Sequence, residues 1–157
     1  MFSLFIRNLF FTILQPGIVA GLLPYLILGR RIHEVTASPL SFFQYSVMLF
    51  FILGSIILFS CIISFAVKGK GTLSPADPPK QLVVNGLYKY SRNPMYIGVL
   101  VMLLAEVIFF RSFALLLYAC VVASVLYAFI RLHEEPWLKK NFGEAYNRYC
   151  KDVKRWI

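Results

Sequence analysis

Four long apolar stretches constrain the fold of this chain more than any other feature of its sequence. They cover about residues 9–28, 42–67, 94–110 and 113–130. A helix of about 20 apolar residues, within a range of roughly 17–25, crosses the hydrocarbon core of a bilayer, so all four stretches qualify, the third narrowly. Because 59% of the residues are hydrophobic and 15% are charged, against about 45–50% and about 25% in soluble domains, a water-soluble core cannot bury them. We therefore expect an all-α, polytopic membrane protein with about four transmembrane helices.

The first stretch is interpreted as a spanning helix. It is too long for a signal peptide, and it lacks a charged N-terminal region and a small-residue cleavage signal. Pro16 and Pro24, with Gly17 and Gly21 nearby, predict a kink in it. Residues 111–112 alone separate the third and fourth stretches, so we expect these two to form a tight antiparallel hairpin.

The lysines and arginines predict which helix ends face the cytoplasm. With four spans, the N-terminus, the loop 68–93 and the C-terminal tail share one side, which carries all 16 lysines and arginines except Arg30, Arg31 and Arg111. The positive-inside rule makes this side cytoplasmic. We expect an integral protein of the bacterial inner membrane, whose net charge of +9 meets anionic lipid headgroups and not nucleic acid.

Cysteines and histidines give no sign of a disulfide framework or a metal site. Cys61, Cys120 and Cys150 are odd in number and far apart, and two of them lie in apolar stretches. His33 and His133 are equally remote from each other. We therefore expect no metal centre.

Two polar regions fall on the predicted cytoplasmic side. The first half of the loop 68–93 is rich in Gly, Ser and Pro and reads as a flexible linker, whereas its second half ("LVVNGLYKY") is apolar and aromatic and should be ordered. The tail has an apolar stripe with helical spacing that predicts a C-terminal amphipathic cytoplasmic helix at the membrane interface, which Gly143 divides into two pieces. The stripe consists of Leu138, Phe142, Tyr146, Tyr149 and Val153.

The acidic residues in or beside the apolar stretches are few, and each one suggests a contact. Arg131 precedes Glu134 by three residues and Glu135 by four, within helical reach. The two carboxylates therefore either pair with this arginine or face a ligand with amines, hydroxyls or positive charge. Glu106 is the one acid deep in an apolar stretch, and we interpret it as a structural polar contact with the fourth stretch or the 111–112 loop.

The segment "RNPMYIG" places a cation where the third helix meets the headgroups. Asn93 precedes a proline and is biased towards an extended conformation, and Pro94 suits the first position of a helix. Arg92 and Asn93 should therefore stand just outside the helix. One turn in, Gly98 permits the close approach of another helix or of a ligand.

Together, "DPPKQLVVNGLYKYSRNPMYIG" and "HEEPWLKKNFGEAYNRYCKDV" resemble the isoprenylcysteine carboxyl methyltransferase family. That family belongs to a wider group of small membrane methyltransferases that includes the phospholipid N-methyltransferases. The resemblance covers about residues 68–155. It implies S-adenosylmethionine as the methyl donor, an N-terminal transmembrane helix pair (1–67) and a methyltransferase core (68–157). The core would contain the loop, the hairpin 94–130 and a cofactor-binding tail.

The resemblance also implies roles for individual residues. The segment 92–98 matches an Arg-His-Pro-x-Tyr-x-Gly motif, with Asn93 in place of the usual histidine, and Lys154 stands where a proline is frequent. The implied catalytic residues are Arg92, Arg131 and Glu135. The implied cofactor-binding residues are Tyr88, Arg92, Asn93, Pro94, Tyr96, Gly98, Glu134, Glu135, Phe142, Tyr146 and Tyr149.

The expected reaction is methyl transfer to a lipid-like or isoprenoid acceptor that enters from the bilayer. O-methylation of a carboxylate is favoured over N-methylation of an amine. Two alternatives stay open. One is a membrane NADPH-dependent reductase of the steroid-reductase type, which needs no Gly-x-Gly-x-x-Gly fingerprint. The other is a non-catalytic membrane protein that retains the architecture.

Overall fold

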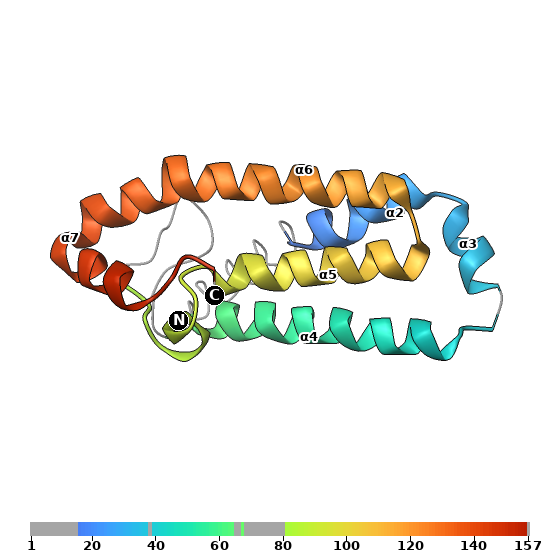
Figure 1. Cartoon of the computed structure of the whole chain (residues 1–157), viewed down its shortest axis with the longest axis horizontal. Coiled ribbons are helices and arrows are strands. Elements are labelled where there is room, and N and C mark those ends of the chain that lie inside the picture. The colour runs from blue at the N-terminus through green and yellow to red at the C-terminus, as the bar shows by residue number, and fades with distance from the viewer. Residues whose placement is uncertain (1–15, 38, 65–66, 68–80, 157) are drawn as a thin grey trace.

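The computed structural model describes residues 16–37, 39–64, 67 and 81–156. These ranges are mainly helical and contain no strand. Figure 1 shows the three longest apolar helices running lengthwise, with α4 packed against α5 and α5 against α6. In chain order the elements are η1 (Ile18–Leu22), α2 (Leu23–Leu28), α3 (Arg31–Thr36), α4 (Phe42–Ser64), η3 (Gly86–Lys89), α5 (Pro94–Phe110), α6 (Phe113–Phe129), η4 (Ile130–Glu134) and α7 (Glu135–Asp152).

Two of the four expected spans are helices long and apolar enough to cross a membrane. They are α4 and the continuous helical run Phe113–Asp152, whose apolar part is α6. The helix α5 has 17 residues, or about 25 Å at 1.5 Å per residue, and Ile18–Leu28 is shorter still. The start of the first stretch, residues 9–15, lies outside the described residues.

The apolar side chains of these helices point outward as well as inward. Leu49 of α4 is 66% exposed and Val121 of α6 is 61% exposed. Many large apolar side chains exposed on the same helices mark contact with a membrane or another protein.

The predicted kink in the first stretch is confirmed. Ala20 has non-helical dihedral angles (φ −108°, ψ 18°) inside the π-helical turn η1. Pro24 lies four residues later and has no N–H to donate, so one carbonyl of the preceding turn loses its helical partner. The Val19 carbonyl accepts a hydrogen bond from the Tyr118 hydroxyl of α6 instead (2.7 Å).

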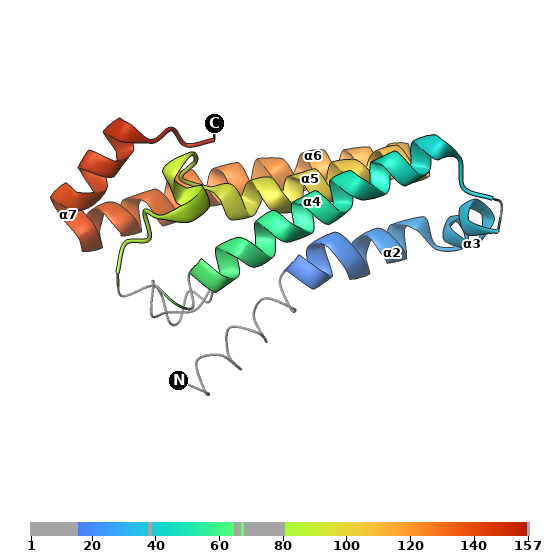
Figure 2. The same ribbon diagram turned by 90° about the horizontal axis from the view of Figure 1, so that it is seen from below.

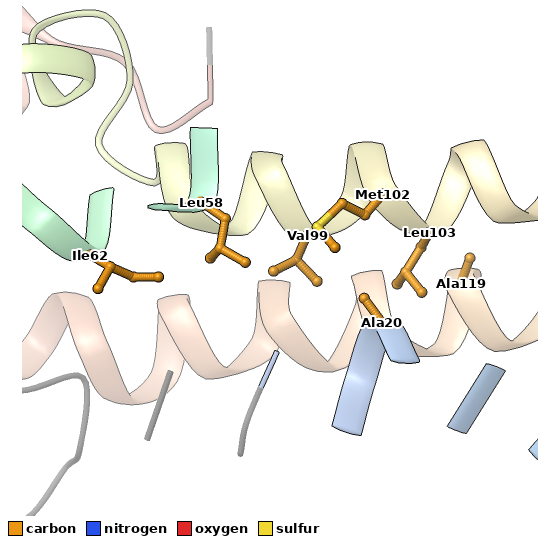
Figure 3. Packing of buried hydrophobic residues seen from close by; sticks show 7 residues of the cluster. All are labelled: Ala20, Leu58, Ile62, Val99, Met102, Leu103 and Ala119. Carbon is orange, nitrogen blue, oxygen red and sulfur yellow. The ribbon is translucent and has the colours of Figure 1, made fainter. Parts of the chain in front are cut away.

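The core lies between η1, α4, α5 and α6 (Figure 3). A close contact between α4 and α5 joins two glycines, Gly54 of α4 and Gly98 of α5. A Cβ on Gly98 would stand 2.9 Å from the Gly54 carbonyl oxygen, so only glycine lets the two backbones approach this closely. The buried residues of the cluster are Ala20, Leu58, Ile62, Val99, Met102, Leu103 and Ala119.

The predicted hairpin of α5 and α6 is also confirmed. Arg111 adopts the left-handed conformation (φ 47°, ψ 45°) that ends α5, and the Ser112 hydroxyl caps α6 by accepting from the Leu115 N–H (3.4 Å). Near this end Glu106 was expected to make a polar contact. Its Oε2 atom is buried and has no hydrogen-bond partner among the described residues.

The loop and the tail meet at the opposite end of the bundle. Residues 81–93 are ordered, as predicted, with Val83 and Tyr88 packed on Cys61 of α4. The predicted break in the tail helix occurs at Gly143 (φ 48°, ψ −122°). The second half of α7 thus turns back, and the C-terminal residues return to the start of α5 (Figure 2). The predicted linker, residues 68–80, is not among the described residues.

Candidate active site

The two sequence blocks come together where α5 begins. Asn93 is non-helical (φ −128°, ψ 48°) and Pro94 occupies the first turn of α5, so the turn 91–93 projects from the helix end. The junction of η4 and α7 brings Glu134 and Glu135 to the same place. The described residues after α7 complete the site by crossing the turn.

Glu135 is held between two arginines. The Nε and Nη2 groups of Arg155 donate to its two carboxylate oxygens at 2.8 and 2.9 Å, a bidentate geometry that strengthens the pair. The Nη1 atom of Arg92 lies 3.3 Å from Oε1 of the same carboxylate. The Arg92 and Glu135 side chains are only 14% and 19% exposed, so water screens this network weakly.

Arg92 has donor capacity to spare. Its Nη1 also donates to the Cys150 sulfur (2.7 Å). Its Nε is buried and has no hydrogen-bond partner among the described residues. A buried N–H without a partner is costly, so this group is suited to meeting a ligand oxygen.

The neighbouring carboxylate has a different environment. Glu134 accepts a hydrogen bond from the Tyr96 hydroxyl (2.8 Å). Burial raises the pKa of Glu134 above its ordinary value, the Tyr96 hydrogen bond opposes this, and the charge of Glu135 adds to the rise. The π-helical turn η4 ends at Glu134, and such wide turns recur at functional sites.

Tyrosines support the site from α7 and the loop. The Tyr149 hydroxyl donates to the Tyr88 carbonyl (2.6 Å), and both side chains are buried. Burial raises the pKa of Tyr149 to about 12, so its hydroxyl remains a donor at physiological pH. Tyr146 is buried beside Tyr149, with ring centroids 6.3 Å apart. Two members of the predicted amphipathic stripe therefore face protein and not the membrane surface.

Several predicted site residues lie elsewhere. Arg131 is exposed, and its Nη1 donates to the Tyr127 hydroxyl (3.2 Å), so Glu135 pairs with Arg155 in its place. Gly98 faces α4. Phe142 packs edge-on against Trp137 (6.0 Å between ring centroids).

Comparison with known proteins assigns the family. The family model described as phospholipid methyltransferase matches residues 43–145, more than half of the chain. This chain belongs to the phospholipid methyltransferase family. No curated protein and no solved structure matches it at the threshold used.

The match confirms the resemblance inferred from the two sequence blocks. It contains α4, α5, α6 and the Glu134–Glu135 pair, and it ends before Tyr146 and the residues that follow. Family membership, together with the two apolar helices, indicates a membrane methyltransferase.

Methyltransferases of this family suggest S-adenosylmethionine as the donor, and the residues present fit it. The unpartnered Nε of Arg92 matches one carboxylate, that of the cofactor or that of an acceptor. The carboxylates of Glu134 and Glu135 match an ammonium or ribose hydroxyls.

Arg155 was missed by the sequence reasoning. The tail contains several basic residues of similar appearance, and spacing within the tail does not single out one that lies 20 positions from its partner. The sequence did offer one signal, because it has 16 lysines and arginines and only 7 acidic residues. An arginine that reaches a carboxylate is therefore expected to pair with it.

Proposed function

We propose that this protein is a membrane methyltransferase that uses S-adenosylmethionine to methylate a lipid-like or isoprenoid acceptor, with carboxylate O-methylation favoured. The observation that carries the proposal is the Arg92–Glu135–Arg155 network at the end of a bundle with apolar outer surfaces. It is the point where a polar cofactor and a lipophilic acceptor can meet.

The free hydrogen-bonding capacity of the site favours an anionic acceptor. Both carboxylates have partners, Glu135 with two arginines and Glu134 with Tyr96. Among the described residues of the site, the buried side-chain group without a hydrogen-bond partner is the donor Nε of Arg92. An arginine donor orients a carboxylate and stabilises its charge.

An amine acceptor is the second candidate, because of Glu134. A buried carboxylate with a raised pKa is a better proton acceptor than an ordinary one, and methylation of an amine releases a proton. The family's name also refers to phospholipids, some of which carry an amine.

S-adenosylmethionine supplies an electrophilic methyl group on a sulfonium. The contribution of the protein is alignment, which itself accelerates a displacement strongly. Arg92 would orient a carboxylate, Glu135 would hold Arg92 in place, and Tyr96 would keep Glu134 directed at the site. The other implied cofactor-binding residues and Arg131 stay predictions.

We propose further that the site end faces the cytoplasm of a bacterial inner membrane. The described basic residues of the loop and of the tail lie there, whereas Arg30, Arg31 and Arg111 lie in the other connections. The division into a helix pair (1–67) and a core (68–157) is also a proposal, and the family match spans that boundary.

Calorimetry in detergent tests the cofactor. We expect saturable binding of S-adenosylhomocysteine, weakened about tenfold or more in Glu135→Ala and Arg92→Ala, because each loses part of a charge-assisted network. Arg148→Ala, on the exposed face of α7, is the matched control and should bind normally. Binding of NADPH instead would indicate a reductase, and binding of neither by folded protein would indicate a non-catalytic role.

The acceptor is tested by transfer of a radiolabelled methyl group. Membranes would be supplied with an isoprenoid carboxylic acid or with phosphatidylethanolamine. A label released as methanol by alkali is a methyl ester and supports O-methylation. A label that migrates with the phospholipid before alkali treatment and is not released as methanol by it is an N-methyl group and supports the second candidate.

A further inference from the structure

The chain after α7 lies across the turn that precedes α5. The Arg92 backbone N–H donates to the Lys154 carbonyl (3.0 Å). The Arg155 carbonyl accepts from the Ser91 hydroxyl (3.2 Å) and from the Asn93 side-chain amide (3.0 Å). Both Ser91 and Asn93 are buried. Three hydrogen bonds therefore fix residues 153–156, called the strap below, on the motif turn.

The strap also directs a side chain into the site. Arg155 makes two short hydrogen bonds to Glu135, whereas Arg92 makes one longer contact at 3.3 Å from a nitrogen that it shares with Cys150. Of the two arginines, Arg155 is thus the one that sets the orientation of the carboxylate.

We propose that Arg155 is a positioning residue of the methyltransferase site. It clamps Glu135 in the plane of its own guanidinium and thereby holds Arg92, whose Nε stays available to a ligand. Asn93 supports the same arrangement, since it binds the strap where the resembling family usually has histidine. The inference rests on the proposed function for the nature of the ligand. It concerns residues beyond the part of the chain that the family model matches.

A ligand-free measurement tests the clamp. The chain has two tryptophans, so Trp137→Phe leaves Trp156 of the strap as the sole tryptophan, which can be excited selectively over the tyrosines. In that background we expect Arg155→Ala to raise acrylamide quenching of Trp156 about twofold, because the strap loses its bidentate anchor. Arg148→Ala, also a loss of one arginine charge, should leave quenching unchanged. Equal quenching in all three proteins would overturn the proposal.

Affinity for S-adenosylhomocysteine then separates positioning from simple support of the fold. We expect about tenfold weaker binding in Arg155→Ala, the effect of losing one charge-assisted pair. Arg155→Lys keeps the charge and should restore the shielding of Trp156, but it lacks the planar fork. Arg155→Lys should therefore still bind S-adenosylhomocysteine more weakly than the unsubstituted protein. Full affinity in folded Arg155→Ala, or full recovery by lysine, would contradict a positioning role.

The two proposals fail in different ways. If the unsubstituted protein does not bind S-adenosylhomocysteine, the proposed function is wrong, and the quenching experiment still decides whether Arg155 anchors the strap. If the unsubstituted protein binds and the Arg155 variants bind equally well, the function stands and the role of Arg155 is wrong.

Discussion

Replacing Gly98 by alanine should weaken the contact between α4 and α5. The new Cβ would stand 2.9 Å from the Gly54 carbonyl oxygen and 3.1 Å from the Leu58 backbone nitrogen, whereas ordinary contacts begin at 3.4 Å. Both neighbours are backbone atoms and cannot rotate away, so the helices must separate. Overpacking of this kind costs about 1–3 kcal/mol, and alanine recovers up to about 1 kcal/mol of helix preference. We expect a net loss of about 0–2 kcal/mol in the free energy of unfolding, which leaves this variant about 1–3 kcal/mol below one that gains the helix preference without the overpacking.

Equilibrium unfolding in mixed micelles of increasing dodecyl sulfate content, followed by circular dichroism, measures this loss. Gly21→Ala is the matched control, because a Cβ at Gly21 meets no atom within 4 Å. The control should be neutral or stabilised by up to about 1 kcal/mol.

Equal stability of the Gly98 and Gly21 variants would refute the packing argument. The same variants test the implied cofactor role of Gly98. Since its missing side chain faces α4, we expect folded Gly98→Ala to bind S-adenosylhomocysteine within about twofold of the unsubstituted protein. A drop of about tenfold or more would mean that Gly98 also meets the ligand.

Three further predictions follow from single contacts. Tyr118→Phe should lower the free energy of unfolding by about 1–3 kcal/mol, because the Val19 carbonyl loses its donor; an unchanged unfolding curve would contradict this. Tyr149→Phe should cost a similar amount, since a 2.6 Å bond to the buried Tyr88 carbonyl is lost, and the same unfolding titration measures it. Glu134 has a pKa raised above its ordinary value of 4.5, so folded protein binds its proton more tightly than unfolded protein. The stability of the unsubstituted protein should therefore fall as pH rises from that value through the raised pKa. Glu134→Gln cannot ionise, and its stability relative to the unsubstituted protein should rise over the same window. A stability difference that does not vary with pH would disprove the raised pKa.

Local sequence signals predicted the helices well. The bounds expected for the third stretch coincide with α5, and those of the fourth differ from α6 by one residue. Pro94 and Gly143 act on their own backbone, through a fixed φ and a positive φ respectively. The charge distribution also predicted that the loop and the tail share one end of the bundle.

Contacts made over long sequence separations were harder to predict. Arg131 stands at helical spacing from Glu135, so spacing alone favoured it, yet the bend at Gly143 carries the tail back and delivers Arg155 instead. Likewise, the sequence left open whether Gly98 permits the close approach of a helix or of a ligand. In the structure α4 packs against Gly98.

The sequence by itself determined that this chain forms apolar helices, where they begin and end, and to which family it belongs, because composition, periodicity and motif spacing are local properties. Only the tertiary structure decided which arginine holds Glu135, which helix fills the space beside Gly98, and that Asn93 binds the strap. Those choices depend on the path of the chain through space, and many pairings of similar residues satisfy the same local pattern.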